Sequence, residues 1–334
     1  MSSDRSFRAL LGPPNAGAGD LPTFSVVIAA YNAASTVGEA VDSALRQTLP
    51  PLEVIVADDG STDDTASAIA PYRDRIVYLR RPHAGVAPAR NAALEHAKGE
   101  FLAVLDADDT YLPERLEALA TLAAARPDLD ILCTDAFLEV DRRVVGRFGE
   151  DTPFEVVNQR TAIIERCFCV APAFRRSTML AAGAYDESMR TAEDWELVLR
   201  LLFGGAAAGL VDEPLYRYRI HPASLTADRI PALRERVGFL QSVRDTYELD
   251  IDEHDALSRS LARQRAALAL TEVEAALRAR SADARRRALA AALVGGVGLR
   301  TRSAALAAAL APRTAARMLE RRARRGRSRL ERVV

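Results

Sequence analysis

The sequence predicts an α/β fold, a mostly parallel sheet with helices on both faces, followed by a C-terminal helical extension. Short apolar runs rich in β-branched residues alternate with helical patterns in the first half of the 334-residue chain. Such alternation is typical of parallel sheets covered on both faces. From Pro231 onward the pattern is helical and rich in Ala, Arg and Leu. We therefore expect a flexible lead-in at residues 1–22, an α/β domain at 23–225 and a helical region with a basic tail at 226–334.

The expected strands are short and apolar. Phe24–Ala30 is almost wholly apolar, as in a strand buried on both faces. A helical pattern follows it from Ser35, the expected N-cap, to Arg46. The other strands of this half are expected at Glu53–Asp58, Arg75–Arg80 and Phe101–Leu105. The other helices are expected at Asp63–Ala70, Pro88–Lys98 and Asp194–Phe203.

Composition and charge exclude several classes of protein. The formal net charge is -1, so no overall positive field favours nucleic acid. No apolar run is long enough for a transmembrane helix, and three cysteines are too few for a disulfide framework. These features predict a cytoplasmic protein. Cys167-Phe-Cys169 has the spacing of inward positions of a buried strand rather than that of a zinc-binding pair.

Polar clusters follow three of the predicted strands. They are Tyr31-Asn32, Asp58-Asp59 and Asp106–Asp109. In open parallel sheets ligands bind beyond the carboxyl ends of the strands. Because all three clusters stand at predicted carboxyl ends, the sequence predicts an active site at that edge of the sheet.

These clusters belong to a longer series of motifs. The series is Val27-Ile-Ala-Ala-Tyr-Asn32, Asp58-Asp-Gly-Ser-Thr-Asp63, Ala89-Arg-Asn91, Asp106-Ala-Asp-Asp109, Glu193-Asp-Trp195 and Tyr218-Arg-Ile-His221. In order and spacing it resembles the large family 2 of inverting glycosyltransferases. The resemblance implies the GT-A fold, a nucleotide-sugar donor and a hydroxyl acceptor.

The Asp106-Ala-Asp108 element suits the leaving group of such a transfer. A departing diphosphate needs charge stabilisation, and Mg²⁺ or Mn²⁺ provides it with few protein ligands because phosphate and water supply the rest. The resemblance implies that Asp108 is a metal ligand and that Asp106 binds the ribose or the metal. It also places His221 on the metal or the diphosphate, although a structural histidine is the alternative. For Asp109 the alternative to chemistry is a turn that caps the next helix.

The ends of the first two strands are expected to bind the nucleoside of the donor. A carboxylate can accept the N3–H of uracil, and the resemblance gives this role to Asp59, with Asp58 supporting a turn that Gly60 allows. Ala30 and Tyr31 would border the base, although a tyrosine at a strand end is commonly a core residue. These acids favour a UDP-sugar and leave GDP- and dTDP-sugars open.

Two further charged residues are expected in the site. The planar fork of Arg90 suits base or phosphate oxygens, and a solvated helix arginine is the alternative. In an inverting displacement one carboxylate removes the proton of the acceptor hydroxyl. The resemblance assigns this role to Asp194, for which a favourable position in the first turn of a helix is the alternative. Trp195 is expected to line the acceptor site or to fill the core.

The expected activity is metal-dependent transfer of one sugar in the synthesis of a cell-surface polysaccharide, glycolipid or glycoconjugate. The Gln-x-x-Arg-Trp motif of processive relatives is absent from the sequence, which favours single transfers. A non-catalytic nucleotide-sugar or carbohydrate-binding protein of the same fold is the alternative. A dinucleotide-dependent oxidoreductase is disfavoured because the turn Tyr31–Ser35 contains no glycine.

The C-terminal region carries no catalytic motif. Its last fourteen residues contain seven arginines and follow the apolar stretch Ala304–Leu310. This pattern is compatible with peripheral contact at the inner face of the cell membrane, where lipid-linked acceptors reside. It is equally compatible with a solvated helical bundle or with a helix that docks a partner. No aromatic residue in the tail supports nucleic-acid binding.

Overall fold

The computed structural model describes residues 21–221, 228–294 and 299–318. The chain divides into two compact units, Met1–Ser224 and Leu225–Val334, which are described separately. Three features expected from the sequence fall outside the described residues: the lead-in up to residue 20, the domain boundary at 225–226 and the basic tail from residue 319 onward.

The first unit is built on a mixed sheet whose first half is parallel, as the sequence predicts. Strand order is β3-β2-β1-β4-β8-β6-β9-β5, with β7 paired to β6. The parallel strands are β1 (Phe24–Ala30), β2 (Glu53–Asp58), β3 (Val77–Arg80) and β4 (Phe101–Asp106). In their register Ala30 lies beside Asp58, and Ala29 lies beside Asp106. The pairing therefore brings the polar clusters that follow β1, β2 and β4 to one edge of the sheet.

The second half of the sheet is mostly antiparallel. It contains β5 (Thr110–Tyr111), β6 (Ile131–Val140), β7 (Arg143–Arg147), β8 (Ala173–Arg175) and β9 (Ala208–Arg219). The long strand β9 runs parallel to β6 and antiparallel to β5. Because β5 follows β4 after a three-residue turn, this pairing brings the end of β9 to the acidic cluster of that turn.

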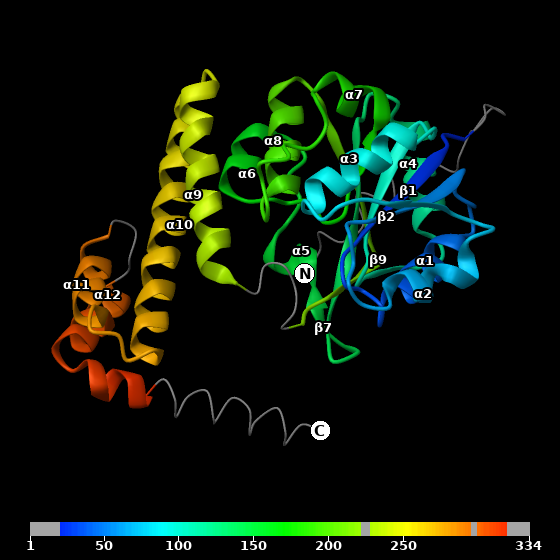
Figure 1. Ribbon diagram of the computed structural model, residues 1–334. Helices are drawn as coiled ribbons and strands as arrows, with labels where there is room; N and C mark the ends of the chain where they lie inside the picture. The colour runs from blue at the N-terminus through cyan, green and yellow to red at the C-terminus, as the bar shows by residue number, and fades with distance from the viewer. Residues whose placement is uncertain (1–20, 222–227, 295–298, 319–334) are drawn as a thin grey trace. The chain divides into compact units, whose positions relative to one another are not determined.

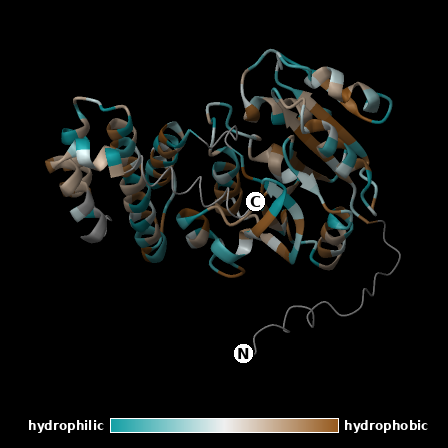
Figure 2. Ribbon diagram, turned by 90° about the horizontal axis from the view of Figure 1, so that it is seen from below, coloured by the Kyte–Doolittle hydropathy of each residue, from teal (hydrophilic) through white to brown (hydrophobic). Residues whose placement is uncertain are grey.

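Helices cover both faces of the sheet. On one face Val37 and Val41 of α1 share a buried cluster with Val26 and Ile28 of β1, whereas α3 packs against the other face of β1 and β2 (Figure 1). The strands between them are coloured as strongly hydrophobic in Figure 2. The helices of this unit are α1 (Val37–Leu45), α2 (Thr65–Ile69), the 3₁₀ turn η1 (Ala70–Tyr72), α3 (Val86–His96), α4 (Arg115–Ala125), α5 (Phe148–Asp151), α6 (Gln159–Glu165), α7 (Arg176–Ala181) and α8 (Glu193–Phe203).

Two local predictions are wrong. Ser35 is not the N-cap of α1, because the helix begins after Thr36, which makes no side-chain capping hydrogen bond. Cys167 and Cys169 lie in irregular backbone rather than in a strand. The Cys167 thiol donates to the carbonyl of Cys169, so a local contact replaces strand pairing there. Trp195 fills the core, where its indole N–H donates to the carbonyl of Ile163.

The second unit is helical, as the sequence predicts. It contains α9 (Arg229–Thr246), α10 (Ile251–Arg278), α11 (Ala284–Leu293) and α12 (Leu299–Leu310). The helix α10 begins at a capping box, in which the Asp250 side chain accepts from the backbone N–H of Glu253 and Glu253 accepts from that of Asp250. A small core rich in alanine joins α10, α11 and α12. Among the described residues, no helix combines the length and apolar character that a bilayer crossing requires.

Candidate active site

Backbone and side-chain hydrogen bonds fasten the end of β1 to the end of β2. The N–H of Asp59 donates to the carbonyl of Ala30 at 2.8 Å. Asn32 adopts a left-handed φ of 49°, and its side-chain oxygen accepts from the N–H of Thr62 at 2.8 Å. Ala30 is thereby buried against the turn that follows β2, and its expected contact with the donor stays a prediction.

Asp58 supports the turn that follows β2. Its carboxylate is fully buried and accepts hydrogen bonds from the N–H of Ser61 at 2.8 Å and from the hydroxyl of Tyr78. Burial alone would raise the pKa of Asp58, but the hydrogen bonds from Tyr78 and Ser61 lower it below its ordinary value. Both oxygens already have partners, which agrees with the supporting role expected for this residue.

Gly60 makes the sharp turn that the sequence predicts. Its φ is +75°, and a Cβ at this position would lie 2.7 Å from the backbone nitrogen of His83. A side chain there would therefore be strained by its own backbone and by the neighbouring loop. The glycine lets the loop at residues 81–85 pass directly over the end of β2.

Asp59 holds that loop. Its carboxylate accepts from the N–H of Gly85 at 2.7 Å and from that of Ala84 at 3.1 Å, and it lies 2.8 Å from Nδ1 of His83. The His83 ring in turn stacks on Tyr31, with 4.0 Å between centroids and 20° between planes. The side chain of His83 is 54% exposed and Tyr31 is 46% exposed. Both rings therefore reach solvent at the edge where ligands bind in such sheets.

Asp109 joins the acidic turn to the end of β9. It is buried and accepts from the N–H of Arg219 and from the hydroxyl of Tyr216, both at 2.7 Å. Burial, together with the charges of Asp106 and Asp108, raises the pKa of Asp109 well above its ordinary value. These contacts give Asp109 a structural role. They do not make it a helix cap, because α4 begins after Glu114.

The two residues expected to bind a metal lie together. Oδ2 of Asp108 is 2.8 Å from Nε2 of His221, and each side chain is about one-third exposed. The short distance follows from the hydrogen bond between Asp109 and Arg219, because His221 is the second residue after Arg219. Burial, with a smaller contribution from Asp106, raises the pKa of Asp108, and His221 opposes this shift.

This pair fits a hard divalent cation that takes most of its ligands from elsewhere. Carboxylate oxygen and imidazole nitrogen are suitable donors for Mn²⁺, and Mg²⁺ prefers oxygen. Within the described residues no three His, Cys, Asp or Glu side chains gather as a complete metal centre. A cation at Asp108 and His221 would therefore depend on oxygen ligands from the substrate and water.

Arg90 of α3 lies at the centre of a buried cluster of charges. Its side chain is 3% exposed. One terminal nitrogen donates to Asp106 at 2.7 Å, and the other donates to Glu193 at 2.9 Å and to Asp194 at 2.8 Å. The guanidinium was expected to reach the base or the diphosphate, and that contact stays untested. In this structure its hydrogen bonds go to three carboxylates.

The carboxylates of this cluster differ in their surroundings. The side chain of Asp194 is 32% exposed, whereas that of Glu193 is buried. Burial and the neighbouring charge of Asp194 raise the pKa of Glu193 to about 8. Burial also raises the pKa of Asp194, and Arg90 opposes that shift while Asp106 adds to it. Asp194 is thus the member of the pair that solvent can reach.

Comparison with known proteins identifies the family. Residues 25–179 match the family model of glycosyl transferase family 2. A UDP-Glc:alpha-D-GlcNAc-diphosphoundecaprenol beta-1,3-glucosyltransferase, WfaP of Escherichia coli, is 30% identical over 227 residues, which cover 66% of this chain and 86% of that protein. The chain belongs to glycosyl transferase family 2. It is therefore a glycosyltransferase.

Solved structures confirm the fold of this family 2 glycosyltransferase. TarS 1-349 of S. aureus in complex with UDP-GlcNAc has a TM-score of 0.61 and 19% identity, with 91% of this chain and 92% of that chain covered. A mannosyltransferase of Pyrobaculum calidifontis in complex with GDP-Man and Mn²⁺ has a TM-score of 0.57 and 22% identity, with 90% and 83% covered. The expected GT-A fold is confirmed.

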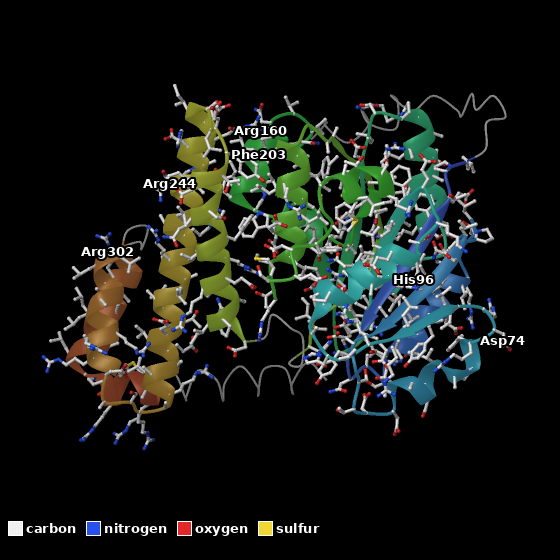
Figure 3. All side chains as sticks on the ribbon, turned by 45° about the horizontal axis from the view of Figure 1, so that its top comes forward. Asp74, His96, Arg160, Phe203, Arg244 and Arg302 are labelled. Atoms are coloured by element: carbon white, nitrogen blue, oxygen red, sulfur yellow. The ribbon has the colours of Figure 1, made fainter. Side chains whose placement is uncertain are left out.

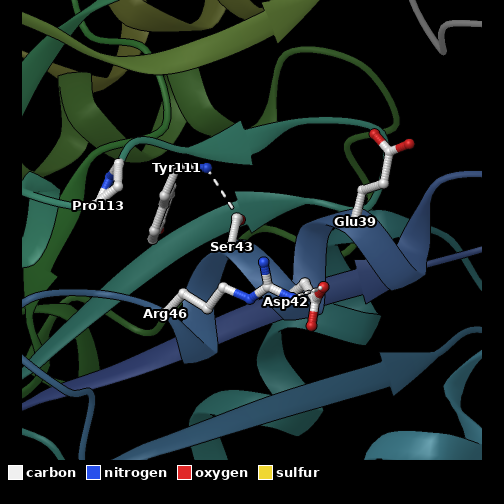
Figure 4. Close-up of a pocket in the computed structure, with 6 residues that line it drawn as sticks. All are labelled: Glu39, Asp42, Ser43, Arg46, Tyr111 and Pro113. Atoms are coloured by element: carbon white, nitrogen blue, oxygen red, sulfur yellow. Dashed lines mark hydrogen bonds and ion pairs between the residues drawn. The ribbon is translucent and has the colours of Figure 1, made fainter.

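A shallow pocket of about 290 Å³ on the glycosyltransferase is separate from these residues. It is lined by Glu39, Asp42, Ser43, Arg46, Tyr111 and Pro113 (Figure 4). Arg46 and Asp42 already pair at 2.9 Å there, and Ser43 accepts from the N–H of Tyr111. None of the expected site residues lines this pocket.

Sequence reasoning missed two members of the glycosyltransferase site. His83 belongs to none of the motifs; its side chain is 54% exposed, and it pairs with Asp59 and stacks on Tyr31. His96, by contrast, lies exposed at the end of α3 (Figure 3). Glu193 had no role of its own, although it stands beside Asp194 in the motif. The loop position of His83 between two motifs was the only signal for it, because its partners are distant in sequence.

Proposed function

We propose that the chain is a metal-dependent inverting glycosyltransferase that moves one sugar from a nucleoside-diphosphate sugar to a hydroxyl acceptor. One observation carries this proposal. Asp106 and Asp108, which suit the leaving group, lie at the same edge as Asp194, which suits the nucleophile, and Arg90 bonds to both Asp106 and Asp194. One cluster therefore contains candidate groups both for stabilising the leaving diphosphate and for activating the attacking hydroxyl.

A UDP-sugar is the proposed donor. The exposed rings of Tyr31 and His83 offer a flat aromatic surface for a base, since aromatic side chains can stack on the face of any nucleobase. Asp59 stands beneath them at 3% exposure, so a hydrogen bond from uracil would have to displace one of its present partners in the loop at residues 81–85. The name of the relative WfaP specifies UDP-Glc, and TarS was solved with UDP-GlcNAc, whereas the Pyrobaculum enzyme carries GDP-Man. These relatives support the nucleotide-sugar class and leave the sugar to experiment.

Asp108 and His221 would hold the divalent cation. Such an ion, bound there, would stabilise negative charge on the departing diphosphate as a Lewis acid. The Mn²⁺ in the similarly folded mannosyltransferase supports this proposal. Asp106 would bind the ribose or share the ion, and Arg90 beneath it keeps its carboxylate at the edge of the site.

Asp194 would act as the general base. As the acceptor hydroxyl attacks the anomeric carbon, its proton passes to the Asp194 carboxylate. The new bond joins the acceptor oxygen to that carbon, while the bond to the diphosphate oxygen breaks and its electron pair leaves with the diphosphate. Attack from the face opposite to the leaving group inverts the configuration. The first-turn position of Asp194 in α8 and its partial exposure support this role.

The proposed acceptor belongs to cell-surface polysaccharide, glycolipid or glycoconjugate synthesis, and a lipid-linked acceptor is favoured. The name of WfaP includes alpha-D-GlcNAc-diphosphoundecaprenol, which supports a lipid-linked acceptor. Leu310 is strongly exposed in the helical unit and lies three and seven residues before Arg313 and Arg317, a combination that suits an anionic membrane surface. Sedimentation with anionic vesicles tests this membrane contact. If the wild type and Arg313→Glu/Arg317→Glu sediment equally, a membrane contact through these arginines is excluded.

The direct test is donor turnover with and without Mn²⁺. Wild-type protein should release UDP from UDP-glucose or UDP-N-acetylglucosamine, and chelation should stop the release. Asp194→Asn should lower turnover by about 10³-fold, within the range for loss of a general base. Asp128→Asn, a change of the same type at an exposed ion pair with Arg126, should leave turnover unchanged. Metal-dependent UDP binding without any turnover would favour the non-catalytic alternative.

A further inference from the structure

A buried arginine connects the two halves of the proposed reaction. Arg90 comes from α3, Asp106 from the end of β4, and Glu193 and Asp194 from the start of α8. They lie 16, 103 and 104 residues from Arg90 in sequence. The guanidinium joins Asp106 to the adjacent pair on α8, because one terminal nitrogen faces Asp106 and the other faces Glu193 and Asp194.

We propose that Arg90 is a positioning residue, which fixes the Asp194 carboxylate relative to Asp106 in the place from which it takes the acceptor's proton. This inference rests on the proposed base role of Asp194 and adds a group that does not itself touch the substrate. The 2.8 Å hydrogen bond occupies Oδ1 of Asp194. About a third of the surface of this side chain stays exposed.

Burial explains why this residue acts through Asp194 rather than on the donor. At 3% exposure the guanidinium offers almost no surface to a diphosphate. Its two terminal nitrogens make three hydrogen bonds to carboxylates, all between 2.7 and 2.9 Å. Two parallel N–H groups on a rigid plane hold carboxylates in a defined geometry, which a lysine ammonium on a flexible chain does not reproduce.

Arg90 also offsets the negative charge of the carboxylates around it. Asp106, Glu193 and Asp194 lie within hydrogen-bond distance of one cation. Burial raises the pKa of Asp194, and Arg90 is the main group that opposes this shift. The groups that face Asp194 are Arg90 of α3, Asp106 of β4, Glu193 of its own helix, and Tyr185 and Cys169 of the preceding segments. Arg90 is the one cation among them.

Arg90→Lys separates positioning from donor binding. We expect this variant to lose about 100-fold in kcat, the order expected when a catalytic group is displaced by about 1 Å. The Kd for UDP with Mn²⁺, measured by titration calorimetry, should change far less than kcat, by no more than about threefold, because Arg90 can affect the donor only through Asp106. The acidic limb of the pH profile of kcat/KM should move to higher pH, since weaker opposition from the cation lets the pKa of Asp194 rise.

The double variant Arg90→Lys/Asp194→Asn tests whether the effect passes through Asp194. If Arg90 only positions Asp194, then Arg90→Lys should change the residual turnover of Asp194→Asn by less than about twofold. The matched control is Arg200→Lys, which removes a partly exposed guanidinium on the same helix that binds Glu196 and the carbonyls of Ala182 and Ala184. It should keep its turnover within about twofold, because these hydrogen bonds go to Glu196, Ala182 and Ala184 and not to Asp194.

Three outcomes are decisive. A UDP Kd that rises in step with the loss of turnover would make Arg90 a donor ligand and overturn the inference. Losses that multiply in the double variant would overturn it as well. If Asp194→Asn keeps wild-type turnover, the proposed base itself fails, whatever Arg90 does. If Trp195 fluorescence shows that Arg90→Lys does not fold, the test is made instead on Arg90→Ala with a low concentration of guanidinium chloride. Recovery of kcat would support positioning. A folded Arg90→Ala protein whose kcat does not recover would oppose it.

Discussion

Replacing Gly60 with alanine tests how the base-binding edge is held together. Gly60 has a left-handed φ of +75°, and the new Cβ would lie 2.7 Å from the nitrogen of His83 and 3.0 Å from the carbonyl oxygen of Arg81. Both neighbours are backbone atoms, so neither can rotate away as a side chain does. The loop at residues 81–85 must therefore move.

The cost has two parts. Alanine in the left-handed region costs roughly 1–2 kcal/mol. Displacement of the loop also weakens the hydrogen bonds from Ala84 and Gly85 to the buried Asp59 carboxylate, and a hydrogen bond to a charged group contributes about 1.5–3 kcal/mol. We expect Gly60→Ala to lower the free energy of unfolding of the first unit by about 3–5 kcal/mol.

Gly205→Ala is the matched control. Gly205 has a φ of +95°, but nothing lies within 4 Å of its added Cβ. It should cost only the roughly 1–2 kcal/mol of backbone strain. Urea unfolding followed by the fluorescence of Trp195, the single tryptophan, reports on the first unit. Calorimetry with UDP and Mn²⁺ should show weaker binding for Gly60→Ala alone, since its loop carries His83.

Equal losses of stability in the two variants would refute this reasoning. That result would mean that the loop accommodates a methyl group without cost and that φ alone limits position 60. Unchanged UDP affinity in a folded Gly60→Ala protein would separately refute the link between this turn and the base-binding surface formed by Tyr31 and His83.

The remaining predictions concern the base, the metal and pH. Tyr31→Ala should weaken UDP binding by about 10-fold in calorimetry, because base–aromatic stacking contributes about 1–3 kcal/mol; an unchanged Kd would exclude the aromatic surface. Asp108→Asn and His221→Ala should each weaken UDP binding in Mn²⁺ but leave it unchanged in a chelator, and equal losses in both conditions would exclude the metal role. The pKa of Asp58 is lowered in the folded protein, so its stabilisation is complete above the ordinary carboxyl pKa and is lost as pH falls through the lowered value. Urea unfolding of Asp58→Asn should therefore show a shallower loss of stability below about pH 4 than the wild type, and parallel acid profiles would contradict this.

The sequence alone determined the framework of the glycosyltransferase. The alternation of short apolar runs and helical patterns placed β1, β2, β3 and β4 within a residue or two of their observed bounds. The reason is that a strand buried on both faces of a parallel sheet needs a continuous apolar run, which is visible in the sequence itself. It also placed Asp58-Asp59 and Asp106–Asp109 at the carboxyl ends of strands, where the register does bring them together.

Local details were less predictable where tertiary contacts compete with sequence preference. Serine is a common N-cap residue, but the N–H of Val37, which the Ser35 side chain would accept as a cap, donates to the carbonyl of Ala33 at 2.9 Å. The helix therefore begins later, at Val37. Likewise, Cys167 and Cys169 alternate as in a strand, yet no neighbouring strand pairs with them in the described sheet.

Only the tertiary structure decided the partners of the charged and aromatic side chains. The motifs indicated that Arg90 and Asp194 belong to one site, but not that the first is buried and bonded to the second. Nor could they place His83 on Asp59 and Tyr31. The physical reason is that a local pattern records which face of an element is buried. A contact between residues 104 positions apart depends instead on how α3 and α8 meet at the end of β4.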